Sequence, residues 1–600
     1  PARVGASPTP TLLLLLLLLL LAGCSRGRQE ARLQGGQPDA PDMPPAVSSL
    51  LRTAVESGAL PADARRQKER VQAFEETHQF YRKRNFQPAW SDLRGPLPRA
   101  QELVAAIDGL AVDALDPAEY DREGLARLLR EAKWEGRLDD PAVQRHLADL
   151  DLTLTYHFLV MATHMATGRL QPDTLQTDWY TKPRNVDLDV VLTRALGPDG
   201  IPKALASLAP PSPAYTRLRE AFARYGEIVK RGGWTPLPAG PRLALGVTDE
   251  RVRLLRTRLA AEGDLHAGAP KAAGAPEEST YDEALASVVA RFQGRQGLKV
   301  TGAVDTDTLE ALNVPAEARR RQIAVNMERW RWLPSDYGRR YILVNVPEFE
   351  LTMVDGGQKA MRMRVIVGKT QSQTPAFSNR ITRIDLNPIW HLPSSIVQKE
   401  IAPAVARDPG YLARKHLEVV KSSGEGTQTV SPGEVDWSRM GKGDYPYRVR
   451  QPSGPDNALG RIKFVIPDQF DVYLHDTPSA RLFNSTERDL SHGCVRLEHP
   501  IELAAYLLKD DQKWSREAIE EALDSGETKS VPLPAPLPVH ILYWTAWVEE
   551  DGTVQFRKDI YGHDGELDQA LKAEPKVTLD PAALRGERRV KRGDVDPVPG

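Results

Sequence analysis

A cysteine and a histidine late in the chain have the types and spacing that suit nucleophilic catalysis. Residues 491–496 read Ser-His-Gly-Cys-Val-Arg, and Cys494 follows His475 by nineteen residues. A cysteine nucleophile needs a basic or imidazolium partner and hydrogen-bond donors for the oxyanion that develops on the attacked carbonyl. His475 can pair with the thiol, Gly493 lets the amides of 492–494 turn toward one oxyanion hole, and Arg496 adds a fixed cation. With His492, these residues predict acyl transfer by a cysteine.

The only other cysteine, Cys24, follows an export signal. A run of leucines at 12–21 is too short to span a bilayer but has the length of a signal-peptide core, and it leads into Leu-Ala-Gly-Cys. This string resembles the lipobox of bacterial lipoproteins. It implies a signal peptide at 1–23, a lipid on Cys24, a tether at 24–47 and, because Ser25 follows, anchoring in the outer membrane facing the periplasm. The exported body then keeps one unpaired thiol, which again points to Cys494.

The composition sets the number of folding units and disfavours some classes of partner. At 600 residues the chain predicts several domains. Its 79 basic and 81 acidic residues give a net charge of -2, so no global field attracts nucleic acid, and no nucleic-acid partner is expected. The 41% hydrophobic and 27% charged residues are typical of globular domains.

Hydrophobic periodicity divides the chain into segments. Apolar residues recur at three- and four-residue steps over 48–235, which predicts an all-α domain. Within it, His157 and His164 share a helical face but have no third ligand at short spacing, so surface or core roles are favoured over a metal site. A compact three-helix unit is predicted over 243–314. From 340 to 525, period-two alternation and a Gly-Gly turn predict a mainly-β domain.

Three further segments complete the predicted organisation. A polar stretch at 396–450 interrupts the β domain, and we expect it to be an inserted lid whose underside carries the apolar residues Tyr411, Leu412, Leu417 and Val419. A β extension is expected at 530–565. The basic, Gly- and Pro-containing end at 566–600 is expected to be disordered.

The motif of an upstream His followed by Ser-His-Gly-Cys-x-Arg resembles the catalytic motif of the L,D-transpeptidases. The Phe292-Gln-Gly-Arg-Gln-Gly-Leu298 stretch, the Thr-Gly-x-Val-Asp turn that follows it and the Thr-Leu-x-x-Leu-Asn ending at Asn313 resemble a peptidoglycan-binding domain. With Trp330-Arg-Trp-Leu-Pro334, the resemblance covers most of 50–565. Over this range the chain is similar to the long Gram-negative branch of the family, which carries a helical scaffold domain.

The resemblance implies acyl transfer on peptidoglycan stem peptides without a cofactor or metal. Cys494 would attack the L,D bond of a tetrapeptide donor, and His475 would move the proton. The side-chain amine of a diaminopimelate acceptor would then resolve the thioester to give a 3-3 crosslink. Arg496 would either bind a donor carboxylate or order the loop. The resemblance also implies acylation of Cys494 by carbapenem inhibitors.

Several alternatives remain open from the residues alone. The acyl-enzyme could pass to water, as in an L,D-carboxypeptidase, or to a lysine of a membrane lipoprotein. A non-catalytic wall-binding lipoprotein would use the helical domains as a scaffold. A zinc site on Cys494, His475, His492 and His499 is disfavoured because no close ligand pair and no His-Glu-x-x-His helix exist. A serine acyltransferase is disfavoured because Ser-x-x-Lys and Gly-x-Ser-x-Gly are absent from the sequence.

Overall fold

The computed structural model describes residues 45–57, 68–131, 137–175, 178–181, 184–197, 199–265, 278–423, 426–573 and 576–578. The predicted signal peptide, Cys24 and most of the predicted tether lie outside these residues. The tether was expected to run to residue 47, but the first described helix already begins at Pro45, because Val47 is buried. In the described part of the chain, no helix has the length and apolar character needed to span a membrane.

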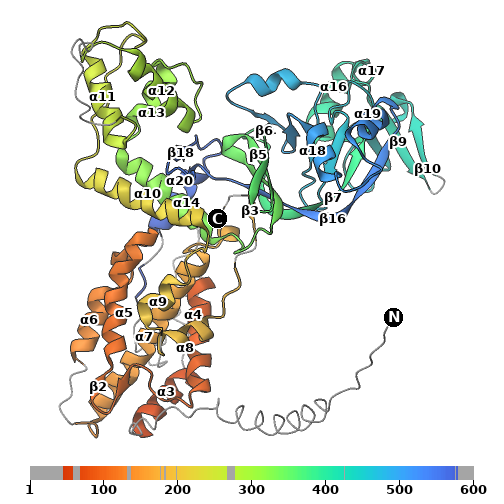
Figure 1. The fold of residues 1–600 in the computed structure, drawn as a ribbon. Helices are drawn as coiled ribbons and strands as arrows, with labels where there is room; N and C mark the ends of the chain where they lie inside the picture. The colour runs from red at the N-terminus through yellow and green to blue at the C-terminus, as the bar shows by residue number, and fades with distance from the viewer. Residues whose placement is uncertain are drawn as a thin grey trace, which may run out of the picture.

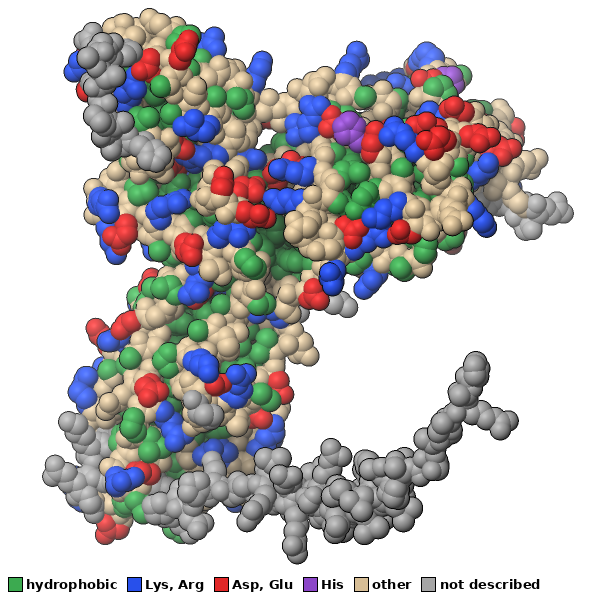
Figure 2. Space-filling view, viewed as in Figure 1, with side chains coloured by type: hydrophobic (Ala, Val, Ile, Leu, Met, Phe, Trp, Pro, Cys, Tyr) green, Lys and Arg blue, Asp and Glu red, His purple; other side chains and the backbone are tan. Residues whose placement is uncertain are grey.

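Three lobes make up the molecule (Figure 1). A helical lobe and a small second helical lobe lie on either side of helices α10 (Pro213–Lys230) and α14 (Ala316–Arg331), and a larger β-rich lobe lies beside them. In the space-filling view of Figure 2, the small lobe and the β-rich lobe form two separate masses above the helical lobe, with acidic and basic side chains interspersed on this face.

The helical lobe is built around α7 (Pro141–Thr167), which is buried along most of its length. Asp140 caps its first turn by accepting from the Ala142 amide, and Gly168, with φ of +94°, ends it. Buried apolar residues from all the surrounding helices form one core with it. These helices are α3 (Pro45–Ser57), α4 (Lys68–Lys83), α5 (Pro98–Gly109), α6 (Arg122–Glu131), α8 (Leu188–Ala195) and α9 (Ile201–Ala206).

The small lobe has a separate core built from three helices. They are α11 (Arg251–Glu262), α12 (Glu283–Arg295) and α13 (Thr306–Asn313). The side chains of Asp282 and Asp305 cap α12 and α13. Gln293, fully buried, accepts from the amides of Thr301 and Gly302 and so fixes the turn between these two helices. The predicted three-helix unit is present.

The β-rich lobe is a sheet that closes on itself. Its strand order is β12-β13-β15-β6-β5-β4-β16-β7, and β12 also pairs with β7, which completes a barrel. Helices α18 (Pro500–Leu507) and α19 (Arg516–Asp524) pack on it. The strands are β4 (Arg340–Asn345), β5 (Glu350–Asp355), β6 (Gln358–Gly368), β7 (Ala376–Leu386), β12 (Ile462–Val465), β13 (Leu474–His475), β15 (Val495–Leu497) and β16 (Lys529–Leu542). In addition, β14 (Asp489–Ser491) pairs with β6.

Four strands differ from the expected domain plan. The stretch expected as a β extension begins with β16, which lies between β4 and β7 inside the barrel and is therefore part of its core. The segment expected to be all-helical contributes β3 (Trp179–Tyr180), which pairs in parallel with β7, and a small hairpin of β1 (Ser91–Asp92) and β2 (Gly95–Pro96). Two-residue strands carry no periodicity, so only long-range pairing reveals them.

The inserted segment is an ordered subdomain, which we call the insertion and define as residues 390–451. Its apolar side chains form their own core, and its four strands follow the order β10-β9-β11-β8. The most polar part of this segment, 421–443, holds most of a hairpin and contributes buried Val435 and Met440. The elements are β8 (Trp390–His391), α15 (Ser394–Ile396), a π-helical turn (Val397–Ile401), α16 (Ala402–Arg407), α17 (Tyr411–Arg414), β9 (Glu418–Ser423), β10 (Gly426–Val430) and β11 (Tyr447–Gln451).

The C-terminal region is more ordered than the sequence predicts. Disorder was expected from residue 566, but α20 (His563–Ala573) continues through this point with Leu567 buried. Farther on, Val577 is buried in the core of the helical lobe, and its amide donates to the Glu119 carbonyl at 2.6 Å. Burial of these two apolar residues offsets the polar composition of the segment. The basic residues near 585–592 lie outside the described part.

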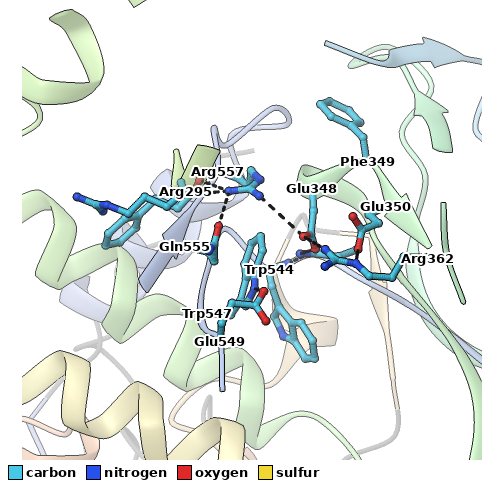
Figure 3. Close-up of polar contacts among 12 residues, drawn as sticks. Arg295, Glu348, Phe349, Glu350, Arg362, Trp544, Trp547, Glu549, Gln555 and Arg557 are labelled. Atoms are coloured by element: carbon cyan, nitrogen blue, oxygen red, sulfur yellow. Dashed lines mark hydrogen bonds and ion pairs between the residues drawn. The ribbon is translucent and has the colours of Figure 1, made fainter. Parts of the chain in front are cut away.

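A buried arginine joins the small lobe to the barrel (Figure 3). Arg557 follows the hairpin of β17 (Ala546–Val548) and β18 (Val554–Phe556). Its guanidinium donates to the Arg295 carbonyl at 3.1 Å and lies 3.8 Å from the Glu348 carboxylate. Burial raises the pKa of Glu348 to about 7, and Arg557 opposes that rise. The small lobe and the barrel are thus joined by polar contacts that are largely shielded from water.

Candidate active site

His475 lies on β13, and Cys494 lies just before β15, the strand that pairs with β13. Strands β13 and β15 run in parallel with His475 opposite Arg496, and Cys494 directly precedes β15. Both residues line a cavity of about 320 Å³. Its walls also include Gly493, Arg496 and His492, so the structure brings all five sequence-predicted residues to one cavity.

His475 is held in one tautomer. Its Nδ1 lies 2.5 Å from the Asp476 carbonyl oxygen, which can only accept, so Nδ1 carries the proton and Nε2 keeps its lone pair. The side chain is buried. Burial, followed by the charges of Arg496 and Lys463, lowers the pKa of His475 to about 3. At neutral pH this imidazole is therefore an unprotonated base.

The Cys494 thiol is also neutral at rest. Its Sγ lies 3.5 Å from the Asp471 carbonyl, to which it donates. Burial raises the pKa of Cys494 to about 11, although contacts with Tyr473 and the charge of Lys463 act in the opposite direction. Of the two partners that the sequence allowed, base or imidazolium, the structure favours the base. A neutral thiol and a neutral imidazole share the cavity, and nucleophilic attack requires proton transfer between them.

Residues 491–496 form the loop that carries Cys494, and we call this segment the catalytic loop. Hydrogen bonds fix its conformation. Ser491 Oγ donates to the Cys494 carbonyl at 2.6 Å. Thr374 Oγ1 donates to the Gly493 carbonyl at 2.7 Å and accepts from the Gly368 amide at 2.8 Å. Ser491 and Thr374 are both buried, so these bonds face little competition from water.

Gly493 differs from its expected role. Its φ of +116° is a conformation that glycine adopts without strain, as the predicted bend requires. Its amide, however, donates to Ser491 Oγ at 3.1 Å, so this amide braces the loop rather than pointing into an oxyanion hole. The reason is local, because the tight turn brings the serine hydroxyl back onto the amide two residues later.

His492 and Arg496 lie between the thiol cavity and a second cavity of about 270 Å³ under the insertion. His492 is exposed, and its Nε2 donates to Glu400 Oε1 of the insertion at 2.6 Å. Burial lowers the pKa of Arg496, and its nearness to Cys494 acts against that change. Arg496 thus lies close enough to the thiol to act on it electrostatically, whereas His492 connects the loop to the insertion.

Sequence reasoning missed two residues beside the thiol. Tyr473 lines the cavity, and burial, followed by the nearby Cys494, raises the pKa of its phenol. Its spacing of two from His475 on a strand put it on the same face, a signal that could have found it. Thr374 lies in a loop far away in the sequence, and no local pattern marks it. Within the described ranges, no group of three or more His, Cys, Asp or Glu side chains is arranged to hold a metal.

Family models match three successive parts of the chain. A scaffold domain matches residues 75–222, a "Putative peptidoglycan binding domain" matches 248–312, and an L,D-transpeptidase catalytic domain matches 339–522. These correspond to the helical lobe, the small lobe and the barrel with its insertion. Together these domains imply a periplasmic or cell-wall location.

Individual relatives are more partial. A Haemophilus influenzae protein named "Putative L,D-transpeptidase" is 35% identical over 249 residues, which is 42% of this chain. The match spans 49% of the relative, about half of its length.

Two solved structures are also similar. An L,D-transpeptidase from Xylanimonas cellulosilytica has 15% identity and a TM-score of 0.16 over 51% of this chain and 100% of its own. The Ldtfm-avibactam carbamoyl enzyme has 11% identity and a TM-score of 0.17 over 43% of this chain and 80% of its own. At these TM-scores neither structure carries an argument. From the matched models, this chain carries an L,D-transpeptidase catalytic domain, preceded by a scaffold domain and a peptidoglycan-binding domain.

Proposed function

We propose that this protein forms 3-3 crosslinks between peptidoglycan stem peptides through a thioester on Cys494. The observation that carries the proposal is the pairing, in one cavity, of a thiol with a buried imidazole whose Nε2 lone pair is unprotonated. In acylation, Sγ attacks the carbonyl of the third residue of a tetrapeptide while His475 Nε2 takes the thiol proton. The carbon–nitrogen bond to D-Ala then breaks, His475 returns that proton to the leaving amine, and the thioester remains.

The second half of the reaction reverses these proton transfers. A neutral side-chain amine of a neighbouring diaminopimelate attacks the thioester, and His475 accepts a proton from the nitrogen. The carbon–sulfur bond breaks, the sulfur regains the proton and the amide crosslink is released. The amides of His492 and Cys494, on either side of the engaged Gly493 amide, would stabilise the oxyanion in both steps.

Incubation with a disaccharide-tetrapeptide tests this function. Wild type should release D-Ala and yield a 3-3 dimer by mass spectrometry, and Cys494→Ala should yield neither. Both proteins should fold, because Cys494 is the one described cysteine and forms no disulfide. Release of D-Ala with only tripeptide as product would instead indicate an L,D-carboxypeptidase. Transfer to a lysine-ended peptide would indicate attachment of a lipoprotein to the wall. If wild type releases no D-Ala, a non-catalytic, wall-binding role would be favoured.

A carbapenem gives an independent test of the nucleophile. The β-lactam ring contains a strained amide, and the thiol can attack its carbonyl with the same proton transfer to His475. The ring then opens at its carbon–nitrogen bond, and the drug stays attached to Cys494 as a thioester. One carbapenem mass should add to the intact wild type and none to Cys494→Ala. A stoichiometric adduct on Cys494→Ala would show that another group reacts.

The insertion is proposed to act as a lid. It lines the second cavity with residues such as Ile401, Tyr411 and Leu417. The two chain segments that join it to the barrel are tied together by the buried Asn457 side chain, which donates to the carbonyls of Pro388 and Pro452. A subdomain with its own core, joined to the barrel through two chain segments, can move as one body. Closure would keep water from the thioester and favour attack by an amine.

Lipid anchoring through Cys24, at the outer membrane, is proposed from the lipobox alone. Radiolabelled palmitate should enter wild type and not Cys24→Ser, and wild type should fractionate with outer membranes. Label that persists in Cys24→Ser would place the lipid elsewhere.

A further inference from the structure

The scaffold domain contributes to the wall of the thiol cavity. Strand β3 pairs in parallel with β7, and the Asp178 carbonyl accepts from the Ala376 amide at 2.7 Å. This pairing places Asp178 among the residues that line the cavity containing Cys494. A residue more than three hundred positions before the nucleophile in the sequence therefore lies in the same site.

Two aromatic contacts hold this strand in place. Trp179 is buried against Trp332, with ring centroids 5.3 Å apart, and so anchors the inner side of β3. Tyr180 is 48% exposed, and its ring lies 4.4 Å from that of Phe470, another residue of the cavity wall. Phe470 directly precedes Asp471, whose carbonyl accepts from the Cys494 thiol. A continuous series of contacts thus runs from β3 to the nucleophile.

The Asp178 carboxylate is positioned and available for a ligand. Tyr180 donates from its hydroxyl to Asp178 Oδ1 at 3.3 Å. Among the side chains that the structure describes, no Lys, Arg or His forms an ion pair with Asp178. Arg496 lines both this cavity and the second cavity under the insertion. Besides Asp471 next to the thiol, Asp178 is the acidic residue in the described lining of the thiol cavity, and it comes from the scaffold.

We propose that Asp178 binds the side-chain ammonium of the diamino acid at the third position of the donor stem. This inference rests on the proposed function. A carboxylate contact stabilises the protonated form of an amine. The acceptor amine must lose its proton before it attacks, so such a contact would slow it. The donor amine takes no part in the chemistry, and it can stay charged through both steps. The scaffold strand would then act as a specificity element for the donor.

The test compares two donors and three proteins. The donors are a tetrapeptide stem with a free side-chain amine at its third residue and the same stem with that amine acetylated. The proteins are wild type, Asp178→Asn and the conservative Asp178→Glu. We expect Asp178→Asn to lower kcat/KM for D-Ala release from the free-amine donor by about tenfold, the size expected for loss of one charge-assisted contact. Asp178→Glu should recover part of the loss.

The acetylated donor distinguishes recognition from a structural role. Wild type should process it as poorly as Asp178→Asn processes the free-amine donor, and Asp178→Asn should show no further loss with it. Alkylation of Cys494 by iodoacetamide, a small neutral reagent without an amine, should proceed at similar rates in all three proteins and reports that the site is folded. An equal loss with both donors would show that Asp178 only supports β3, and that result overturns the inference.

Other outcomes separate this inference from the function on which it rests. Unchanged D-Ala release in Asp178→Asn would overturn donor recognition alone. If Asp178→Asn releases D-Ala at the wild-type rate but forms fewer crosslinks, Asp178 acts on the acceptor, and this result also overturns the inference. If wild type releases D-Ala from neither donor, the proposed function fails, and the inference fails with it.

Discussion

The catalytic loop and the insertion border the same two cavities but are held in different ways. The loop is fixed by buried neutral hydrogen bonds from Ser491 and Thr374. The insertion has its own core, and it contacts the loop through Glu400 and His492, whose side chains are 45% and 36% exposed. Buried hydrogen bonds are costly to break, whereas an exposed pair of polar side chains contributes ~0–1 kcal/mol. The wall that carries the chemistry is therefore rigid, and the wall that faces the substrate can move at little cost.

Removal of the base should have the largest effect on the rigid side. His475→Ala leaves the thiol protonated with no acceptor for its proton, so acylation should fall by ~10²–10⁴-fold. Release of D-Ala in a single turnover measures this step. His499→Ala is the matched control, since His499 is exposed and lies outside the cavity linings. Acylation by His475→Ala within threefold of wild type would mean that another group takes the proton.

The pH dependence of alkylation checks the neutral resting state. Because burial raises the pKa of Cys494 to about 11, the thiol stays protonated below that pH. The rate of reaction with iodoacetamide should rise about tenfold per pH unit from 7 to 10. At pH 7 it should be ~10²-fold slower than that of a free cysteine, whose pKa is ~8.5. A rate that is already at its plateau at pH 7 would indicate a thiolate–imidazolium pair instead.

Loss of a loop brace should have a smaller effect than loss of the base. Thr374→Val removes the hydroxyl that donates to the Gly493 carbonyl and leaves the Gly368 amide without its acceptor. The unpaired groups cost ~1–3 kcal/mol, which we expect to appear as a roughly tenfold lower rate of carbapenem acylation. Thr370→Val is the control, because Thr370 is exposed and makes only a long 3.4 Å bond to the Ile560 carbonyl. Equal rates in both variants would show that the loop is held without Thr374.

The two regions could be predicted from the sequence in different detail. For the catalytic loop, individual residues could be predicted, because Cys494, His475 and the bend at Gly493 belong to one short motif and a neighbouring strand. Its brace Thr374 could not, because it lies in the loop between β6 and β7, more than a hundred residues before Gly493 in the sequence. The insertion was predicted as a polar segment with an apolar underside at Tyr411, Leu412, Leu417 and Val419, which do belong to its core. That core also depends on apolar residues scattered among polar ones, such as Val435 and Met440. Similarly, β3 is defined by pairing with a strand about two hundred residues later.

The smallest effect is expected where the two regions touch. Glu400→Gln keeps a hydrogen-bond acceptor for His492 Nε2 but removes the charge, so the contact should weaken by up to ~1 kcal/mol. If this contact helps hold a lid closed, the open state becomes more populated and water reaches the thioester more often. The ratio of hydrolysed tripeptide to 3-3 dimer should then rise by about two- to fivefold. Carbapenem acylation should not change, since it depends on the rigid wall.

A matched control separates the contact from the charge of the insertion in general. Glu434→Gln removes an exposed carboxylate of the same subdomain that lies outside both cavity linings. It should leave the product ratio as in wild type. A ratio that does not respond to Glu400→Gln would show that the insertion does not close through this contact.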